Sequence, residues 1–139
     1  MRQLSIWIFI LLILFAGRVA AQEWLPVHGG MLLGVGGIVL INGEADPRQF
    51  LVVHDVKGRK VYAAKVTVAG GRLRYVPLDW IGFHEEPRDL EALTRIPGDH
   101  SFMALASKGI VYHIRLGQDE KGRERVEVLN EFWLPNPYN

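Results

Sequence analysis

The chain has 139 residues, of which 49% are hydrophobic, and it contains no cysteine. This length suits one domain, and the apolar content excludes an intrinsically disordered chain. The 16 basic and 15 acidic residues give a formal net charge of +1, which excludes nucleic acid as a general electrostatic partner. Because disulfides are excluded, stability must come from burial, backbone pairing or a bound ion.

The first 21 residues are typical of a secretory signal peptide. Arg2 supplies a positive start, residues 4–16 form an apolar run, and Val19-Ala20-Ala21 places small residues at the expected cleavage site. We predict cleavage after Ala21, with an uncleaved anchor as the alternative, although the run is shorter than the ~20 residues that span a membrane. Loss of Arg2 and Arg18 leaves 14 of the 16 basic residues against 15 acidic ones. We therefore expect a periplasmic or secreted domain, residues 22–139, without membrane attachment.

Residues 31–80 are predicted to form four antiparallel strands. Residues 31–42 are rich in Gly, Val, Ile and Leu, as in a strand that is buried on both faces or that another backbone approaches closely. The glycines of this stretch lack the third position of a dinucleotide-binding fingerprint. Turn residues separate it from strands at 49–56, 60–69 and 72–80.

Two details of this block predict its faces and its edge. Residues 60–69 alternate, which puts Tyr62, Ala64, Val66 and Val68 on the buried side. Pro77 cannot donate a backbone hydrogen bond, so residues 72–80 are expected to form an edge strand.

Residues 89–134 are predicted to form four further strands, after a link at 81–88. The first, residues 89–96, favours a strand, but a short helix after Pro87 is the alternative. Strands at 101–107, 110–116 and 123–134 follow, with turns at Pro97-Gly98-Asp99 and at Lys108-Gly109.

The two blocks also resemble each other. Phe50-Leu-Val-Val-His-Asp precedes a Lys-Gly turn and Val61-Tyr62, while Phe102-Met-Ala-Leu-Ala-Ser precedes a Lys-Gly turn and Val111-Tyr112. An offset of about 50 residues is the length of a propeller blade unit. The sequence thus predicts an all-β fold with two four-stranded antiparallel blades of a partial β-propeller, at about 31–80 and 89–134. An eight-stranded β-sandwich or barrel is the alternative.

The stretch D-L-E-A-L-T at residues 89–94, followed by a Pro-Gly turn, an apolar strand, a Gly turn and a Val-Tyr strand, resembles the exported phytase-like β-propellers, or esterase-like activity of phytase domains. The resemblance covers about residues 37–135. It implies a propeller with a carboxylate-lined channel that binds Ca²⁺ or acts on phosphoesters or other esters. Propellers close with four to eight blades, so this chain would be partial or truncated. Open sheet edges, such as 31–42 and 125–134, would then pair with a second copy or a partner chain.

Three acidic residues are the candidate metal ligands. As strand residues two positions apart, Asp89 and Glu91 would present their oxygens on the same face, as Ca²⁺ requires. Asp55 ends an apolar strand and is the third candidate. The alternative roles are structural, with Asp89 and Asp55 stabilising turns and Glu91 accepting a hydrogen bond.

Other polar residues give weaker signals. His84, Glu85 and Glu86 form either a solvated charge run or a metal site. His54 and Asp55 are adjacent on a strand and so point to opposite faces. The histidines lack zinc-binding spacing and no serine lies in a nucleophile elbow, so no catalytic residue is assigned.

We expect the aromatic residues to serve packing rather than ligand stacking: Trp24, Trp80, Trp133, Tyr62, Tyr75 and Tyr112. The leading functional hypothesis is a noncatalytic exported binding or scaffold module. A calcium-dependent esterase or phosphatase that needs further blades or self-assembly is the alternative. A third reading is a fragment that aggregates when it is made alone.

Overall fold

The computed structural model describes residues 34–55 and 60–135. The predicted signal peptide, residues 1–21, and Trp24 lie outside these ranges. The described residues form eight β-strands. Among them there is no helix of the length and apolar character that crossing a membrane requires.

All eight strands lie where the sequence predicts them, within a few residues at each end. The first four are β1 (Gly34–Leu40), β2 (Arg48–Asp55), β3 (Ala63–Ala69) and β4 (Arg72–Ile81). The second four are β5 (Leu90–Arg95), β6 (Ser101–Ala106), β7 (Ile110–Gln118) and β8 (Glu124–Trp133). The strand at β5 confirms the strand prediction for 89–96 over the helical alternative.

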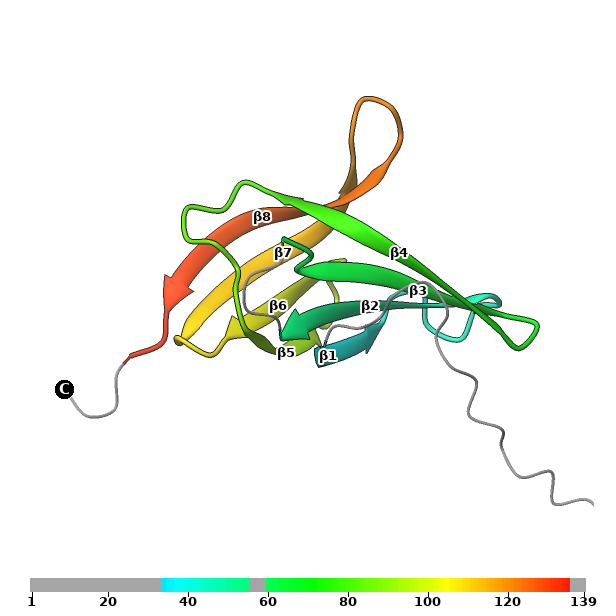
Figure 1. The fold of residues 1–139 in the computed structure, drawn as a ribbon, viewed down its shortest axis with the longest axis horizontal. Coiled ribbons are helices and arrows are strands. Elements are labelled where there is room, and N and C mark those ends of the chain that lie inside the picture. Colours follow the sequence, from blue (N-terminus) through cyan, green and yellow to red (C-terminus); the bar gives the residue numbers. More distant parts are fainter. Residues whose placement is uncertain (1–33, 56–59, 136–139) are drawn as a thin grey trace, which may run out of the picture.

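The strands form one sheet in the order β1-β2-β3-β4-β8-β7-β6-β5. Each block is an antiparallel meander, called here the first meander (β1–β4) and the second meander (β5–β8). The last strands of the two meanders, β4 and β8, pair in parallel. The sheet curls until the first strands, β1 and β5, lie side by side (Figure 1). The result is a nearly closed barrel.

The prediction of two propeller blades is therefore corrected for the described residues. The two four-stranded units are present, but blades are separate sheets arranged radially around a channel. Here Asp79, Trp80 and Ile81 of β4 continue the sheet into β8, opposite Arg125, Val126 and Glu127. The barrel alternative fits this single sheet better, because hydrogen bonding carries one meander directly into the other.

Two glycines let the barrel close between β1 and β5, at a junction called here the seam. A Cβ atom on Gly36 would overlap the carbonyl oxygen of Leu90, and one on Gly37 would lie 2.6 Å from the backbone nitrogen of Leu93. Of the two readings of this glycine-rich strand, the close approach of another backbone is thus confirmed. Burial on both faces is wrong for β1, because Val35 and Ile38 are exposed. The seam also covers β1, residues 34–40 of the edge that the sequence left open at 31–42.

The main core fills the barrel interior with side chains from both meanders, including Leu51, Val53, Phe102, Tyr112 and Ile114. Burial of these side chains is the main source of stability.

A second apolar cluster lies on the other face of the first meander, because Val52 alternates with Leu51 and Val53 along β2. It joins Val52 to Ala64 and Val66 of β3, with Tyr75 packed against them. Of the side predicted to be buried, Ala64 and Val66 are buried in this cluster and Val68 is half-buried. Tyr62 is buried instead in the main core, together with Ala63 of the opposite side.

Two sequence expectations hold only in part. Pro77 faces Ala64 of β3 and lies outside the short ladder with β8, so the sheet edge is open at Pro77, although β4 as a whole lies between two strands. Trp80, Tyr62 and Tyr112 pack as expected in edge-to-face contacts. Trp133, however, is 60% exposed, so the expectation of packing is wrong for this residue.

Candidate metal site

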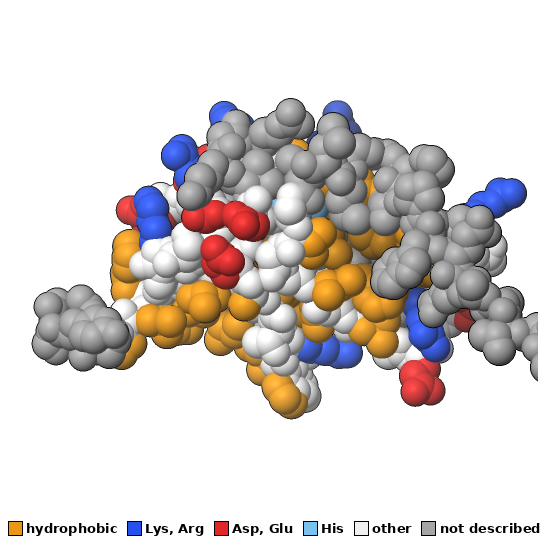
Figure 2. Space-filling view, turned by 60° about the horizontal axis from the view of Figure 1, so that its bottom comes forward, with side chains coloured by type: hydrophobic (Ala, Val, Ile, Leu, Met, Phe, Trp, Pro, Cys, Tyr) orange, Lys and Arg blue, Asp and Glu red, His pale blue; other side chains and the backbone are white. Residues whose placement is uncertain are grey.

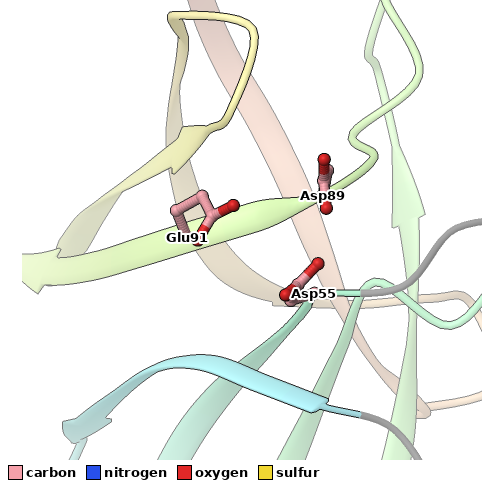
Figure 3. Close-up of side chains that lie close together, drawn as sticks. All are labelled: Asp55, Asp89 and Glu91. Atoms are coloured by element: carbon pink, nitrogen blue, oxygen red, sulfur yellow. The ribbon is translucent and has the colours of Figure 1, made fainter.

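Three carboxylates converge at one end of the barrel, and they are the three candidate ligands from the sequence. One oxygen from each of Asp55, Asp89 and Glu91 lies within 4.8 Å of the other two. Figure 3 shows Asp55 at the end of β2 and the other two where β5 begins. These three residues, called here the acidic cluster, therefore come from both meanders.

The backbone places these side chains in different ways. Asp55 is the last residue of β2 and stands opposite Gly34. Asp89 precedes β5 and has a φ of 58°, a left-handed conformation that Asp tolerates better than most residues. Glu91 lies at an irregularity of β5, between Leu90 and Ala92. The predicted grouping is thus present, but the predicted reason, regular alternation from Asp89 to Glu91, is wrong.

Asp89 also connects two parts of the second meander. The hydroxyl of Ser107 donates to Oδ2 of Asp89 at 2.7 Å, and the backbone nitrogen of Ser107 donates to the carbonyl oxygen of Asp89 at 2.9 Å. These bonds hold the carboxylate in place beside β6. Asp89 therefore has the structural role considered from the sequence and is also a member of the acidic cluster.

The charges of the acidic cluster favour a cation. Two like charges about 4 Å apart repel by ~1 kcal/mol in water, and by more where protein replaces solvent. Asp55 and Glu91 are exposed and Asp89 is half-buried, so an ion can reach all three from solvent. Ca²⁺ takes six to eight oxygen ligands, and three carboxylates offer up to six. The arrangement fits a hard divalent cation.

The acidic cluster lies beside the seam. Gly34, opposite Asp55, is two residues from Gly36, whose backbone meets Leu90 between Asp89 and Glu91. Figure 2 brings the side of β1 and β5 forward and shows acidic side chains grouped close to an apolar surface. Carboxylates from the two meanders thus lie together beside the junction at which the described strands share no ladder of hydrogen bonds.

His54 supports the end of β2 from the opposite face. It is 1% exposed, its Nδ1 lies 3.1 Å from the carbonyl oxygen of Gly34, and the hydroxyl of Tyr75 lies 2.9 Å from its Nε2. Burial lowers the pKa of His54, against the opposing effect of the Gly34 carbonyl. These contacts fit a neutral ring that donates from Nδ1 and accepts at Nε2. The expectation that His54 and Asp55 point apart is confirmed by their difference in burial.

The charged segment 84–86, which lies in the link between the meanders, is only partly exposed to solvent. The side chain of His84 is 94% exposed, whereas Glu86 accepts hydrogen bonds from the hydroxyl of Tyr62 and from Arg88. Arg88, and then Tyr62, lower the pKa of Glu86, while burial and Glu86 raise the pKa of Tyr62 to about 12. Within residues 34–55 and 60–135, the acidic cluster is the one group of three or more candidate metal ligands, so the metal reading of 84–86 receives no support.

A second polar group was missed in the sequence. Ser101 is 2% exposed, and its hydroxyl donates to Oδ2 of Asp99 at 2.9 Å. Nε2 of His113 lies 2.9 Å from the same hydroxyl oxygen. Because the hydroxyl proton points to Asp99, the histidine is the donor here and does not act as a base toward Ser101. These residues brace the turn between β5 and β6.

Comparison with other proteins finds no match: no family model, no curated protein and no solved structure resembles the chain. The resemblance to phytase-like propellers therefore rests on the short motifs of the sequence. The functional inference below starts from the acidic cluster itself.

Proposed function

We propose that this chain is an exported, noncatalytic binding module that holds Ca²⁺ at Asp55, Asp89 and Glu91. The observation that supports this function is the convergence of the three carboxylates from two meanders within 4.8 Å. Export follows from the signal-like segment at 1–21. The proposal includes a partial relationship to phytase-like propellers, and the motif at 89–94 is the sole support for that relationship.

The cation would join the two meanders across the seam. Asp55 belongs to the first meander, whereas Asp89 and Glu91 belong to the region that opens the second. An ion bound by both sides takes the place of the backbone ladder that β4 and β8 have at the other junction. Any ligand that binds only the folded state stabilises it, by about 2.7 kcal/mol at a concentration of 100 times Kd.

A self-contained scaffold module is favoured over a partial propeller that needs additional blades. Residues 125–127 of β8 pair with β4, and the glycines of β1 pack against β5, so part of each edge that the sequence left open has a neighbour within this chain. The ladder with β4 ends at Glu127, and Leu129, Phe132 and Trp133 are exposed, so self-association through this part of β8 stays within the proposal. The calcium-dependent esterase or phosphatase follows from the resemblance alone and is tested by hydrolysis of p-nitrophenyl acetate and p-nitrophenyl phosphate.

The test measures Ca²⁺ binding to residues 22–139 by calorimetry and thermal unfolding. We expect one Ca²⁺ per chain and a higher Tm, with both effects lost in the double variant Asp55→Asn, Glu91→Gln. Glu44→Gln is the matched control, because Glu44 is an exposed carboxylate outside the cluster. An unchanged Tm of the native chain in millimolar Ca²⁺, or equal binding by the double variant, would contradict the proposal.

A further inference from the structure

The first meander is apolar on both of its faces. Its inner face contributes Leu51 and Val53 to the main core, whereas Val52, Ala64 and Val66 lie on its outer face. Cross-strand partners share a face, and the register of β1 to β4 adds further residues to the outer face: Ile38, Leu40, Phe50, Val68, Leu73 and Tyr75. This set is called here the apolar outer face. The outward side of an antiparallel sheet is commonly polar, so a side with this composition favours a cover.

The centre of the apolar outer face is shielded from solvent. Val52 is 2% exposed and Val66 is 6% exposed. All eight described strands belong to one sheet, so none of them forms a second layer over this face. Side chains of a strand stand roughly perpendicular to the sheet, so neighbours within the sheet shield the flanks of Val52 but leave its outer end open. Because the structure contains a single chain, the cover belongs to that chain and lies outside residues 34–55 and 60–135.

Residues 22–33 are the segment best suited to supply this cover. They directly precede β1, and they are rich in apolar side chains, including Trp24, Val27 and Leu32. An extended chain of about 12 residues reaches ~40 Å, whereas four strands spaced ~4.8 Å apart are about 15 Å wide. The segment is therefore long enough to cross the whole meander. Residues 1–21 are predicted to be removed, and residues 136–139 follow β8 in the other meander.

The start of β1 is tied to the apolar outer face. Nδ1 of His54 lies 3.1 Å from the carbonyl oxygen of Gly34, and the hydroxyl of Tyr75 lies 2.9 Å from Nε2 of the same ring. Tyr75 in turn packs against the cluster of Val52. The chain that precedes Gly34 thus begins beside an aromatic side chain of this face, which is where a covering segment has to start.

We propose that residues 22–33 dock across the outer face of the first meander and form part of the mature domain. A tethered segment has an effective concentration on the order of millimolar, so docking needs no second copy of the chain. Ile38 is 58% exposed, which places the edge of the covered area near β1. The proposal uses the predicted cleavage after Ala21, but it does not depend on Ca²⁺, because no residue of the acidic cluster belongs to this face.

The absence of cysteine from the chain allows a test with one introduced thiol. Ala64→Cys places it on the outer face, and Ala63→Cys places it on the inner face one residue away; both alanines are fully buried. The reactions of residues 22–139 with a maleimide are followed in EDTA, so that failure of the proposed Ca²⁺ site does not affect the outcome. We expect slow labelling at both positions.

The deciding variant carries Trp24→Ser, Leu25→Ser and Val27→Ser together. We expect it to raise the labelling rate at position 64 at least tenfold and to leave the rate at position 63 unchanged. Leu129→Ser is the control, because it removes an exposed apolar side chain of β8, and it should change neither rate.

Four results would overturn the proposal. Fast labelling at position 64 in the chain with its native segment would mean that the outer face is open. Protection that survives the triple serine variant would assign the cover to another part of the chain. Equal acceleration at positions 63 and 64 would indicate general unfolding instead of an uncovered face. Protection at position 64 that is lost on dilution of the protein would assign the cover to a second copy.

Discussion

The two meanders meet twice, and the two junctions are built differently. At one, β4 and β8 share a parallel ladder from Asp79 to Ile81, above the buried side chain of Val126. At the other, β1 and β5 meet through glycine backbones, with the acidic cluster beside them. Backbone hydrogen bonds join strands of almost any sequence, whereas close packing without them depends on the absence of particular side chains. The seam is therefore the junction that single substitutions and ions affect most.

The largest effect is expected at the seam itself. Gly36→Val places a branched side chain where even a Cβ atom would overlap the carbonyl oxygen of Leu90. Since a backbone atom cannot turn aside as a side chain does, we expect a loss of about 3 kcal/mol or more in the free energy of unfolding. Urea unfolding measures it. Gly98→Ala is the control: its φ of 77° adds strain but its Cβ meets nothing, so the loss should be only ~1 kcal/mol. Equal losses would show that the seam is not closely packed.

The second test is at the β4–β8 junction. Val126 is fully buried in the main core, whereas Ile81 on the paired strand is 39% exposed. We expect Val126→Ala to lower the free energy of unfolding by about 2–3 kcal/mol, and Ile81→Ala by less than about 1 kcal/mol. Similar losses in both variants would argue against a junction in which Val126 faces the core and Ile81 faces solvent.

The third prediction concerns pH and the support of β1 by His54. Burial lowers the pKa of His54 from 6.5 in the folded state, so the unfolded chain binds the proton more readily. The contribution of His54 to stability is therefore complete above pH 6.5 and is lost as the pH falls toward the lower, folded-state pKa. Each unit of pKa difference corresponds to about 1.4 kcal/mol. The difference in unfolding free energy between pH 7.5 and pH 5 measures it.

His54→Gln is the matched variant for the pH prediction, because its amide can still donate and accept but does not titrate in this range. We expect its stability to depend less on pH between 5 and 6.5 than that of the native chain. An identical pH dependence in both chains would assign the effect to other groups.

The smallest effect is expected at an ion pair of β7 and β8 in which the arginine is largely exposed. Arg115 is 57% exposed and contacts Glu127 at 2.9 Å, and Glu127 is also bound by Arg125. Arg115→Gln should change the free energy of unfolding by less than about 0.5 kcal/mol, because exposed pairs contribute little. Thermal unfolding at low and high salt checks this, and a loss above 1 kcal/mol would mean that this pair is part of a larger network.

The sequence by itself determined the eight strands and their grouping in fours. Alternation, Gly-Gly and Lys-Gly turns, and the apolar run in residues 101–107 are local patterns that each strand carries in its own residues. It also identified the three members of the acidic cluster, because carboxylates at strand ends are visible without a structure.

Tertiary structure alone decided how the meanders join. Nothing near Asp79 or Arg125 in the sequence marks them as partners, since pairing between distant edges depends on which edges the whole chain brings together. For the same reason, the sequence predicted two blades where one nearly closed sheet forms, and it gave the wrong reason for the proximity of Asp89 and Glu91.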